Sequence, residues 1–131
     1  MIRRLTLVAL CLSSTLLFAA ATGAWLKSVP QQERARINPY AVDANAVAAG
    51  AILYKRSCSS CHGGDARGIG RRPSLRIARV HEATDGELHW LLTNGNLAHG
   101  MPSWSRLPDD QRWQLTRSLH TLPVDESKRV D

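Results

Sequence analysis

The feature that most constrains this chain is the pentapeptide Cys58-Ser59-Ser60-Cys61-His62, which has the form C-x-x-C-H. The pattern predicts attachment of one c-type haem, because two thiols separated by two residues can each form a thioether to the same porphyrin. Cys58 and Cys61 are therefore the predicted covalent anchors, and His62 is the predicted proximal ligand of the iron. The fold must present this short segment to a large planar cofactor.

A C-x-x-C pair has two other common uses, as a dithiol redox couple and as half of a zinc site. A tetrahedral zinc site needs two further Cys or His ligands at suitable spacing. The chain has no second C-x-x-C, and its other histidines are too scattered for a zinc-finger spacing; they are His81, His89, His99 and His120. The sequence therefore favours haem over both alternatives.

The length of the chain leaves room for one domain. Its 131 residues, less an N-terminal segment, correspond to about 100 residues around a single core. A domain of this size buries limited apolar surface, so we expect the haem to be structural as well as functional. The aromatic residues are few, with one Phe, two Tyr and four Trp, which suits a small helical fold.

The N-terminal residues have the layout of an export signal: an arginine pair, an apolar run over residues 5–18 and small residues over 19–24. Residues 1–24 are predicted to be a signal peptide cleaved after Ala21 or slightly later. The alternative is an uncleaved anchor, because residues 5–26 are about long enough to span a bilayer. Either way, the remainder is predicted to lie in the periplasm, where haem is attached to C-x-x-C-H in bacteria.

Three helices are predicted after a linker or N-terminal extension at residues 25–42. Asp43 caps the first, which ends at Ser57, directly before the motif. The second begins with the capping box Thr84 to Glu87 and ends at Asn94-Gly95. The third begins at Pro108-Asp109-Asp110 and is expected to end near Leu122. The predicted apolar faces comprise Val47, Ala48, Ala51, Ile52 and Tyr54 in the first helix, and Trp113, Leu115, Leu119 and Leu122 in the third.

The segment after the motif is rich in glycine and then in arginine. Residues 63–70 contain four glycines, which predicts a loop that bends closely around the porphyrin edge. Five arginines then crowd thirteen residues; they are Arg67, Arg71, Arg72, Arg76 and Arg79. Three interpretations remain open for them: a solvated surface, a docking patch for an acidic partner, and a cover for the haem propionates.

Met101 is the predicted sixth ligand of the iron. Of the two methionines, Met1 is the start of the chain and is removed with the export signal. Met101 lies in a Gly-Met-Pro loop rather than on a helical apolar stripe, which argues against a gap-filling role in the core. Methionine opposite histidine favours reduced iron and leaves no open site for oxygen chemistry. His99 is the rival ligand, and we expect the other three histidines to be surface or hydrogen-bonded residues.

Taken in order, these features resemble a class I c-type cytochrome of bacterial type. The resemblance covers residues 43–123, leaves a charged tail at 124–131, and implies an all-α small cytochrome c fold with three to four helices around one covalent haem c. It also implies that the Pro73 carbonyl accepts a hydrogen bond from the second ring nitrogen of His62. Gly50 and Tyr54 match the positions where the first helix crosses the last in this family, although the usual aromatic near Ser118 is absent and Trp113 is the candidate to replace it. A looser resemblance is to small cytochromes that accompany periplasmic dehydrogenases.

The predicted function is electron transfer by a mono-haem carrier rather than enzymatic catalysis. Its expected partners are redox proteins, with a dehydrogenase as donor and an oxidase or another cytochrome of the respiratory chain as acceptor. One alternative is the haem subunit of a dehydrogenase complex; another is a haem sensor or peroxidase, which ligation by Met101 disfavours. A net charge of +6 would suit a nucleic-acid partner. From Cys58 onward, however, the chain has ten Lys and Arg against nine Asp and Glu, so no nucleic-acid partner is predicted. A membrane contact is expected only if the N-terminal segment is not cleaved.

Overall fold

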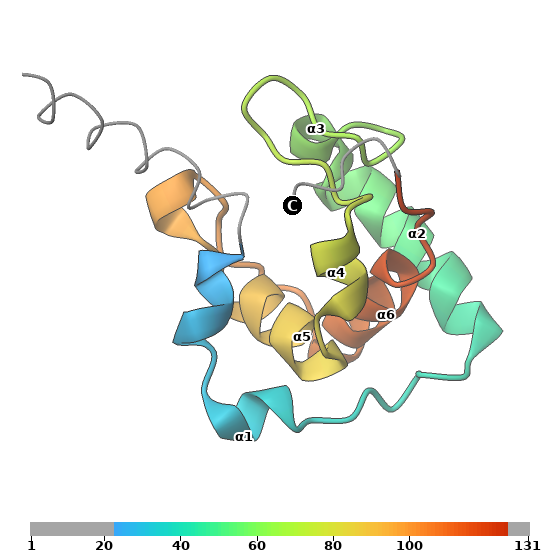
Figure 1. The fold of residues 1–131 in the computed structure, drawn as a ribbon. Helices are drawn as coiled ribbons and strands as arrows, with labels where there is room; N and C mark the ends of the chain where they lie inside the picture. The colour runs from blue at the N-terminus through green and yellow to red at the C-terminus, as the bar shows by residue number, and fades with distance from the viewer. Residues whose placement is uncertain (1–22, 126–131) are drawn as a thin grey trace, which may run out of the picture.

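The computed structural model describes residues 23–125, so most of the predicted export segment lies outside the described residues. The described part is helical, and within it no β-strand is formed (Figure 1). No helix between residues 23 and 125 is long and apolar enough to cross a membrane. In chain order the elements are η1 (Ala24–Ser28), α1 (Gln31–Arg34), α2 (Ala44–Ser57), α3 (Ser59–His62), α4 (Ala78–Glu82), α5 (Asp85–Asn94), η2 (Leu97–His99) and α6 (Asp109–Leu119).

The three predicted helices begin at the predicted residues, and in α2 and α5 a side chain caps the first turn. The Asp43 carboxylate accepts a hydrogen bond from the Asn45 N–H at 2.8 Å, so Asp43 is the N-cap of α2. At α5 both bonds of the capping box form, with Glu87 N–H donating to Thr84 Oγ1 at 3.2 Å and Thr84 N–H donating to Glu87 Oε2 at 2.8 Å. The side chains that satisfy free N–H groups therefore set the start of each of these two helices.

The last helix is shorter than predicted, because α6 ends at Leu119 rather than near Leu122. The next residues form hydrogen bonds that span three residues rather than four: Thr121 N–H donates to the Ser118 carbonyl at 3.1 Å, and Leu122 N–H donates to the Leu119 carbonyl at 3.2 Å. Pro123 follows, and a proline disfavours the helical conformation of the residue before it. The chain therefore leaves α6 through a tight turn.

The core lies where α2 crosses α6, next to α5 (Figure 1). The buried residues of α2 are Ala46, Gly50, Leu53 and Tyr54, which follow the i, i+4, i+7, i+8 spacing of one helical face. The predicted face was wrong in part, because Ala48 and Ala51 are exposed and Ile52 is 62% exposed. The apolar pattern did not mark Gly50, but the family resemblance placed it at the crossing, and its missing side chain sets the side of α2 that meets α6.

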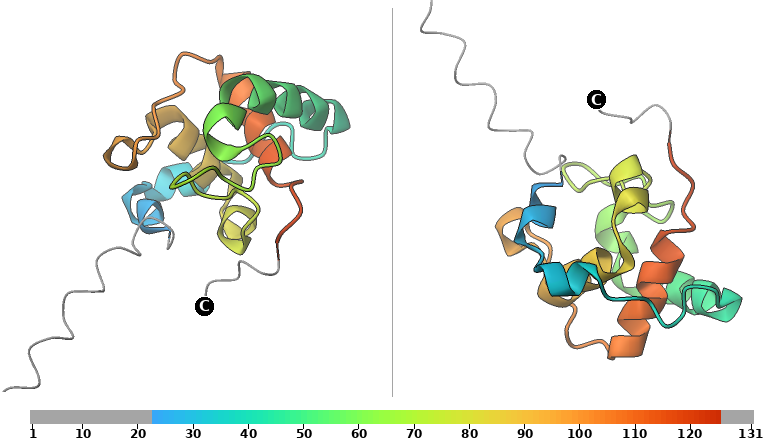
Figure 2. Two further views of the ribbon diagram at one scale, coloured as in Figure 1. Left: turned by 90° about the horizontal axis from the view of Figure 1, so that it is seen from above. Right: turned by 60° about the horizontal axis from the view of Figure 1, so that its bottom comes forward.

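Residues 25–42, predicted as a linker or N-terminal extension, lie against the helical core. Val29 and Asn38 are buried, and the Asn38 side chain donates to the Trp113 carbonyl of α6 at 3.1 Å. A Cβ on Gly86 of α5 would lie 1.8 Å from the Glu33 carbonyl oxygen. The extension therefore drapes closely over α5 and α6, as Figure 2 also shows.

Candidate haem site

The C-x-x-C-H motif forms a single helical turn at the end of α2. Cys58 ends α2 and also begins α3, and its carbonyl accepts from His62 N–H at 2.9 Å. The turn ends at Gly63, whose φ of 85° is accessible to glycine without strain. Both cysteines are half-buried and neither is in a disulfide. The two thiols and the imidazole thus come from one turn, which is the arrangement that attachment and ligation to one porphyrin would require.

His62 is held by the backbone of the loop that follows it. Its Nδ1 lies 2.9 Å from the Pro73 carbonyl oxygen, so Nδ1–H donates to that carbonyl and leaves Nε2 as the free ring nitrogen. The hydrogen bond expected from the family resemblance is therefore present. The His62 carbonyl also accepts from Gly68 N–H at 2.7 Å, which folds the glycine-rich loop back onto α3.

The loop over residues 63–77 is compact, and Gly68 accounts for part of this. Its φ is 85°, and a Cβ there would lie 2.4 Å from the Arg72 carbonyl oxygen. Ala66 is buried, and its carbonyl accepts hydrogen bonds from Leu75 N–H at 2.8 Å and from the Ser74 hydroxyl at 3.3 Å. These bonds fix the path of the chain toward Pro73, so the acceptor of the His62 ring is set by backbone geometry.

Tyr54 ties the motif to the last turn of α2. Its hydroxyl donates to the Gly63 carbonyl at 2.7 Å. Burial, together with nearby Cys58 and Asp65, raises the pKa of Tyr54 to about 12, so the phenol stays protonated and remains a donor throughout the physiological range. Tyr54 thus holds the C-terminal end of α3, where His62 lies.

The environment of Cys58 does not favour dithiol redox chemistry. Burial and then the neighbouring Cys61 raise the pKa of Cys58 to about 11. A redox-active C-x-x-C pair needs the opposite, a lowered thiol pKa that makes the nucleophilic thiolate available. In the part of the chain that the structure describes, no three His, Cys, Asp or Glu side chains gather where they could hold a metal ion, so the zinc alternative gains no support.

Met101 lies in a short segment that is pinned to the end of α5. It forms an isolated antiparallel bridge with Asn96, with N···O distances of 2.8 and 3.1 Å, and its side chain packs half-buried against the core. The rival His99 is exposed, and its Nδ1 lies 3.0 Å from Asn96 Oδ1. Burial and packing thus favour Met101 over His99 as the group that faces the interior.

The residues present fit a haem. Residues 95–107 are here called the Met101 segment. Apolar side chains from the motif, from the following loop and from the Met101 segment pack against the core yet remain only partly buried; they are Cys58, Leu75, Ile77, Met101, Trp104 and Leu107. Figure 1 shows the elements that bear them, with α3 and its loop at the top of the view and η2 with the next segment at the upper left. A small domain seldom leaves so many large apolar groups incompletely covered, and a porphyrin among them would complete the core.

Two of the histidines outside the motif, His89 and His120, have acidic partners, whereas the buried Nε2 of His81 has no hydrogen-bond partner among the described residues, so His81 is neither the surface residue nor the hydrogen-bonded residue that was expected. His89 is buried, stacks on the Trp113 ring at 3.8 Å, and its Nε2 lies 3.0 Å from Asp109 Oδ1. Trp113 Nε1–H donates to the other Asp109 oxygen at 2.9 Å. His120 Nε2 lies 3.2 Å from Asp85 Oδ1. The Trp113 ring is therefore engaged with His89 and Asp109, a cluster that nothing in the sequence pattern indicated.

Four of the five arginines in the run form two pairs with different surroundings. Arg67 and Arg76 both pair with Asp125, at 3.0 Å each, and so tie the loop to the segment after α6. Arg71 and Arg72 are exposed, and Arg72 donates to the Gly100 carbonyl at 3.2 Å, which links the loop to the Met101 segment. The run is thus not one uniform surface patch.

Comparison with known proteins places these features in a family. Residues 45–117, more than half of the chain, match the family model described as "Cytochrome C oxidase, cbb3-type, subunit III". The chain is 29% identical to cytochrome c550 of Pseudomonas aeruginosa over 92 residues, which cover 67% of this chain and 63% of that protein. It is 33% identical to the cbb3-type cytochrome c oxidase subunit CcoP of an Azospirillum species over 82 residues, 56% of this chain and 27% of that subunit. The matches thus span less than two thirds of either relative.

Solved structures give the same fold. The crystal structure of cytochrome cL from Methylophaga aminisulfidivorans superposes with a TM-score of 0.55 and 25% identity, covering 65% of this chain and 58% of that one. Cytochrome cL from Hyphomicrobium denitrificans superposes with a TM-score of 0.58 at 21% identity, covering 79% of this chain and 70% of that one. The predicted all-α architecture is therefore confirmed.

Proposed function

Because this chain belongs to the c-type cytochrome family of the cbb3-type subunit III model, we propose that it is a periplasmic mono-haem carrier. In this role it passes single electrons from a donor, such as a dehydrogenase, to the respiratory chain. The covalent haem c of the family supplies the one-electron ferric–ferrous couple. The observation that carries the proposal is the hydrogen bond from His62 Nδ1–H to the Pro73 carbonyl at 2.9 Å, because it fixes the tautomer and leaves Nε2 for the iron.

Each residue of the site has a separate role in this proposal. Cys58 and Cys61 hold the porphyrin by thioethers, and His62 is the proximal ligand. Pro73 orients the imidazole and increases its basicity through the hydrogen bond to Nδ1. Met101 would supply a thioether sulfur as the sixth ligand, which would raise the potential relative to a second histidine and leave no open position for oxygen chemistry.

The sixth ligand can be tested with a matched pair of variants, Met101→Ala and His99→Ala. The oxidised wild-type protein should show the weak sulfur-to-ferric-iron charge-transfer band at the near-infrared edge. Met101→Ala should abolish the band and lower the reduction potential, whereas His99→Ala should change neither, since His99 is exposed. A wild-type protein without the band, or a band that persists in Met101→Ala, would refute the assignment.

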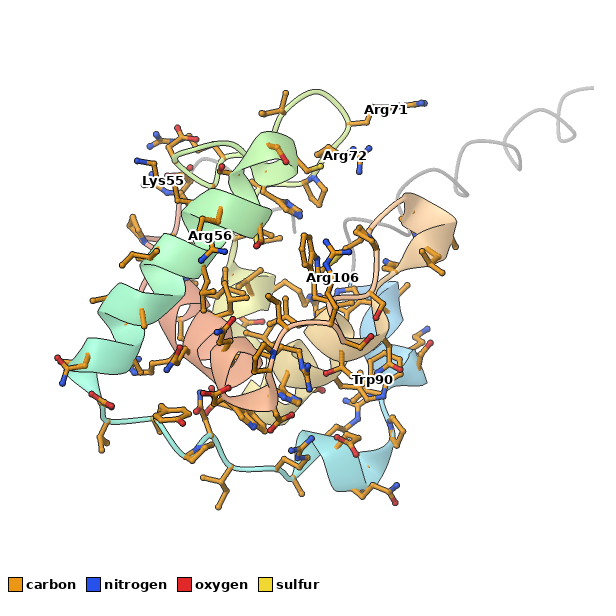
Figure 3. The ribbon with its side chains drawn as sticks, turned by 180° about the vertical axis from the view of Figure 1, so that it is seen from behind. Lys55, Arg56, Arg71, Arg72, Trp90 and Arg106 are labelled. Carbon is orange, nitrogen blue, oxygen red and sulfur yellow. The ribbon has the colours of Figure 1, made fainter. Side chains whose placement is uncertain are left out.

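We place the docking surface for the redox partner on one basic face. Figure 3 shows Lys55 and Arg56 at the end of α2, Arg71 and Arg72 in the loop after the motif, and Arg106 after Met101, on the side of the molecule that faces the viewer. These five side chains belong to exposed residues, and none forms an ion pair with a carboxylate in residues 23–125. Unpaired positive charge next to the motif and the Met101 segment supports an acidic partner, attracted over a Debye length of about 8 Å at physiological salt.

Small charged oxidants can probe this face without knowledge of the partner. Arg71→Glu and Arg72→Glu should slow oxidation of the reduced protein by ferricyanide and accelerate oxidation by a cationic cobalt(III) phenanthroline complex. Both effects should shrink as salt is added, because exposed charges are screened. The double variant Val42→Glu with Asn45→Glu lowers the net charge by the same two units at exposed positions around the start of α2, the end away from the motif, and serves as the control. Equal effects of all three variants would show that only the net charge matters, and would contradict a localised docking face.

A second candidate function is that of a haem-bearing subunit of an oxidoreductase complex. It is favoured by the family model, whose description names an oxidase subunit, and by the similarity to subunit CcoP. Purification of the protein from its native membrane and soluble fractions tests this directly. Stable co-purification with other subunits would favour the complex, and isolation as a free monomer would favour the carrier.

A further inference from the structure

Residues 24–38, here called the N-terminal strap, contribute to the half-buried apolar surface next to the proposed haem site. Trp25 and Leu26 of η1 are partly buried against the same core cluster as Cys58 and Met101. Figures 1 and 2 show η1 beside η2, the short helix that ends two residues before Met101. A segment at the start of the described chain thus lies next to the segment with the proposed sixth ligand.

Arg34 clamps the strap to α5. Its guanidinium donates to the carbonyls of Leu26 and Val29, the latter at 3.2 Å, and pairs with the Glu87 carboxylate. Glu87 is buried, and its other oxygen accepts from Thr84 N–H at 2.8 Å. Both oxygens of the buried carboxylate are therefore used, and removing Arg34 would leave a buried charge without its partner.

The strap also fits closely against the first turn of α5. The Thr84 hydroxyl donates to the Arg34 carbonyl at 3.0 Å, and Gly86 leaves room for the Glu33 carbonyl, which a Cβ would approach to 1.8 Å. Directly before the strap, a Cβ on the buried Gly23 would lie 2.8 Å from the Arg79 side chain. Contacts at three points therefore fix the position of η1.

We infer that the N-terminal strap forms one wall of the haem site, where Trp25 and Leu26 exclude water from the Met101 side. The inference rests on the proposed function, since it takes Met101 as the sixth ligand. Exclusion of water lowers the local dielectric constant, which favours the less charged, reduced iron, and a closed wall hinders the entry of small ligands. The strap then sets both the reduction potential and access to the sixth position.

The test compares Trp25→Ala with Ile37→Ala in the full-length, haem-loaded protein. Ile37 is a matched control because it lies in the same strap but is 85% exposed. Two properties are measured: the reduction potential by optical redox titration, and the rate at which imidazole abolishes the sulfur-to-iron band. Trp25→Ala should lower the potential and accelerate imidazole binding; a tenfold loss of preference for reduced iron corresponds to about 59 mV. Ile37→Ala should match the wild type in both.

The outcomes separate the strap from the proposed function. If the wild-type protein lacks the sulfur-to-iron band, Met101 is not the ligand and the proposed ligation fails. The difference in reduction potential between Trp25→Ala and Ile37→Ala would still test whether the strap forms a wall. If the band is present and Trp25→Ala behaves like Ile37→Ala in both measurements, the wall does not exist. Should Trp25→Ala fail to mature, the same comparison is made with Trp25→Leu, and with Arg34→Lys, which keeps the charge but loses the planar fork that reaches three acceptors.

Discussion

Gly50 is the position at which a single methyl group should do the most damage to this fold. It lies where α2 crosses α6, and a Cβ there would lie 2.1 Å from the Gln114 carbonyl oxygen and 2.6 Å from the Ser118 Cβ. The first of these atoms belongs to the backbone of a helix, so no side-chain rotation can relieve the overlap. Gly50→Ala must therefore push the two helices apart.

The cost can be worked from two opposing effects. Overpacking a core costs about 1–3 kcal/mol, and an overlap this deep with backbone belongs near about 3 kcal/mol. Alanine in place of glycine inside a helix returns about 1 kcal/mol. The free energy of unfolding should thus fall by about 2 kcal/mol, which for a domain of this size lowers the melting temperature by about 8–16 °C.

Thermal unfolding of the haem-loaded protein, followed by far-ultraviolet circular dichroism, measures this change. Gly64→Ala is the matched control, because no atom lies within 4 Å of its Cβ position, and its effect should stay within about 0.5 kcal/mol. Adding Ser118→Gly to Gly50→Ala should restore little of the lost stability, because the overlap with the Gln114 backbone carbonyl remains. A melting temperature of Gly50→Ala within a few degrees of the wild type, or full rescue by Ser118→Gly, would refute the reasoning.

Two further predictions concern the haem anchors and the buried histidine. Cys58→Ser and Cys61→Ser should each leave a haem that acidified organic solvent partly extracts; complete retention in both would contradict the thioether roles. Burial lowers the pKa of His89; Asp109 acts against this shift, and Arg36 and Arg112 add to it. As the pH falls, the histidine therefore takes up a proton at a higher pH in the unfolded state than in the folded state. The free energy of unfolding should therefore fall as the pH drops below about 6.5, and less steeply in His89→Gln; identical pH profiles would contradict this.

The parts of the fold that the sequence predicted are those governed by local chemistry. The Asp43 cap and the capping box of Thr84 and Glu87 satisfy N–H groups within three residues, so their effect is readable from spacing alone. The face of α2 was partly wrong because it depends on α6, which lies far away in sequence. A pattern of apolar residues cannot show that a glycine marks the contact, since close approach of two helices is a tertiary property.

The same distinction applies to the site. Cys58, Cys61 and His62 lie within five consecutive residues, and the turn that groups them follows from helix geometry. The bond from His62 to the Pro73 carbonyl was expected only through family resemblance, because it depends on the path of the loop. The cluster of His89, Trp113 and Asp109 had no local signal, as it joins α5 to α6.

Glu87 connects the local and the tertiary levels. As the third residue of the helix, Glu87 closes the capping box, and its local role was predicted from the spacing to Thr84. Its second oxygen, however, binds Arg34, which fixes the N-terminal strap, a segment predicted from the sequence only as a linker or N-terminal extension. The same helix, α5, leads at its other end to Asn96, which bridges to Met101. One ten-residue helix therefore places both the strap and the proposed sixth ligand, so a substitution at either end of α5 should reach the haem site without touching it.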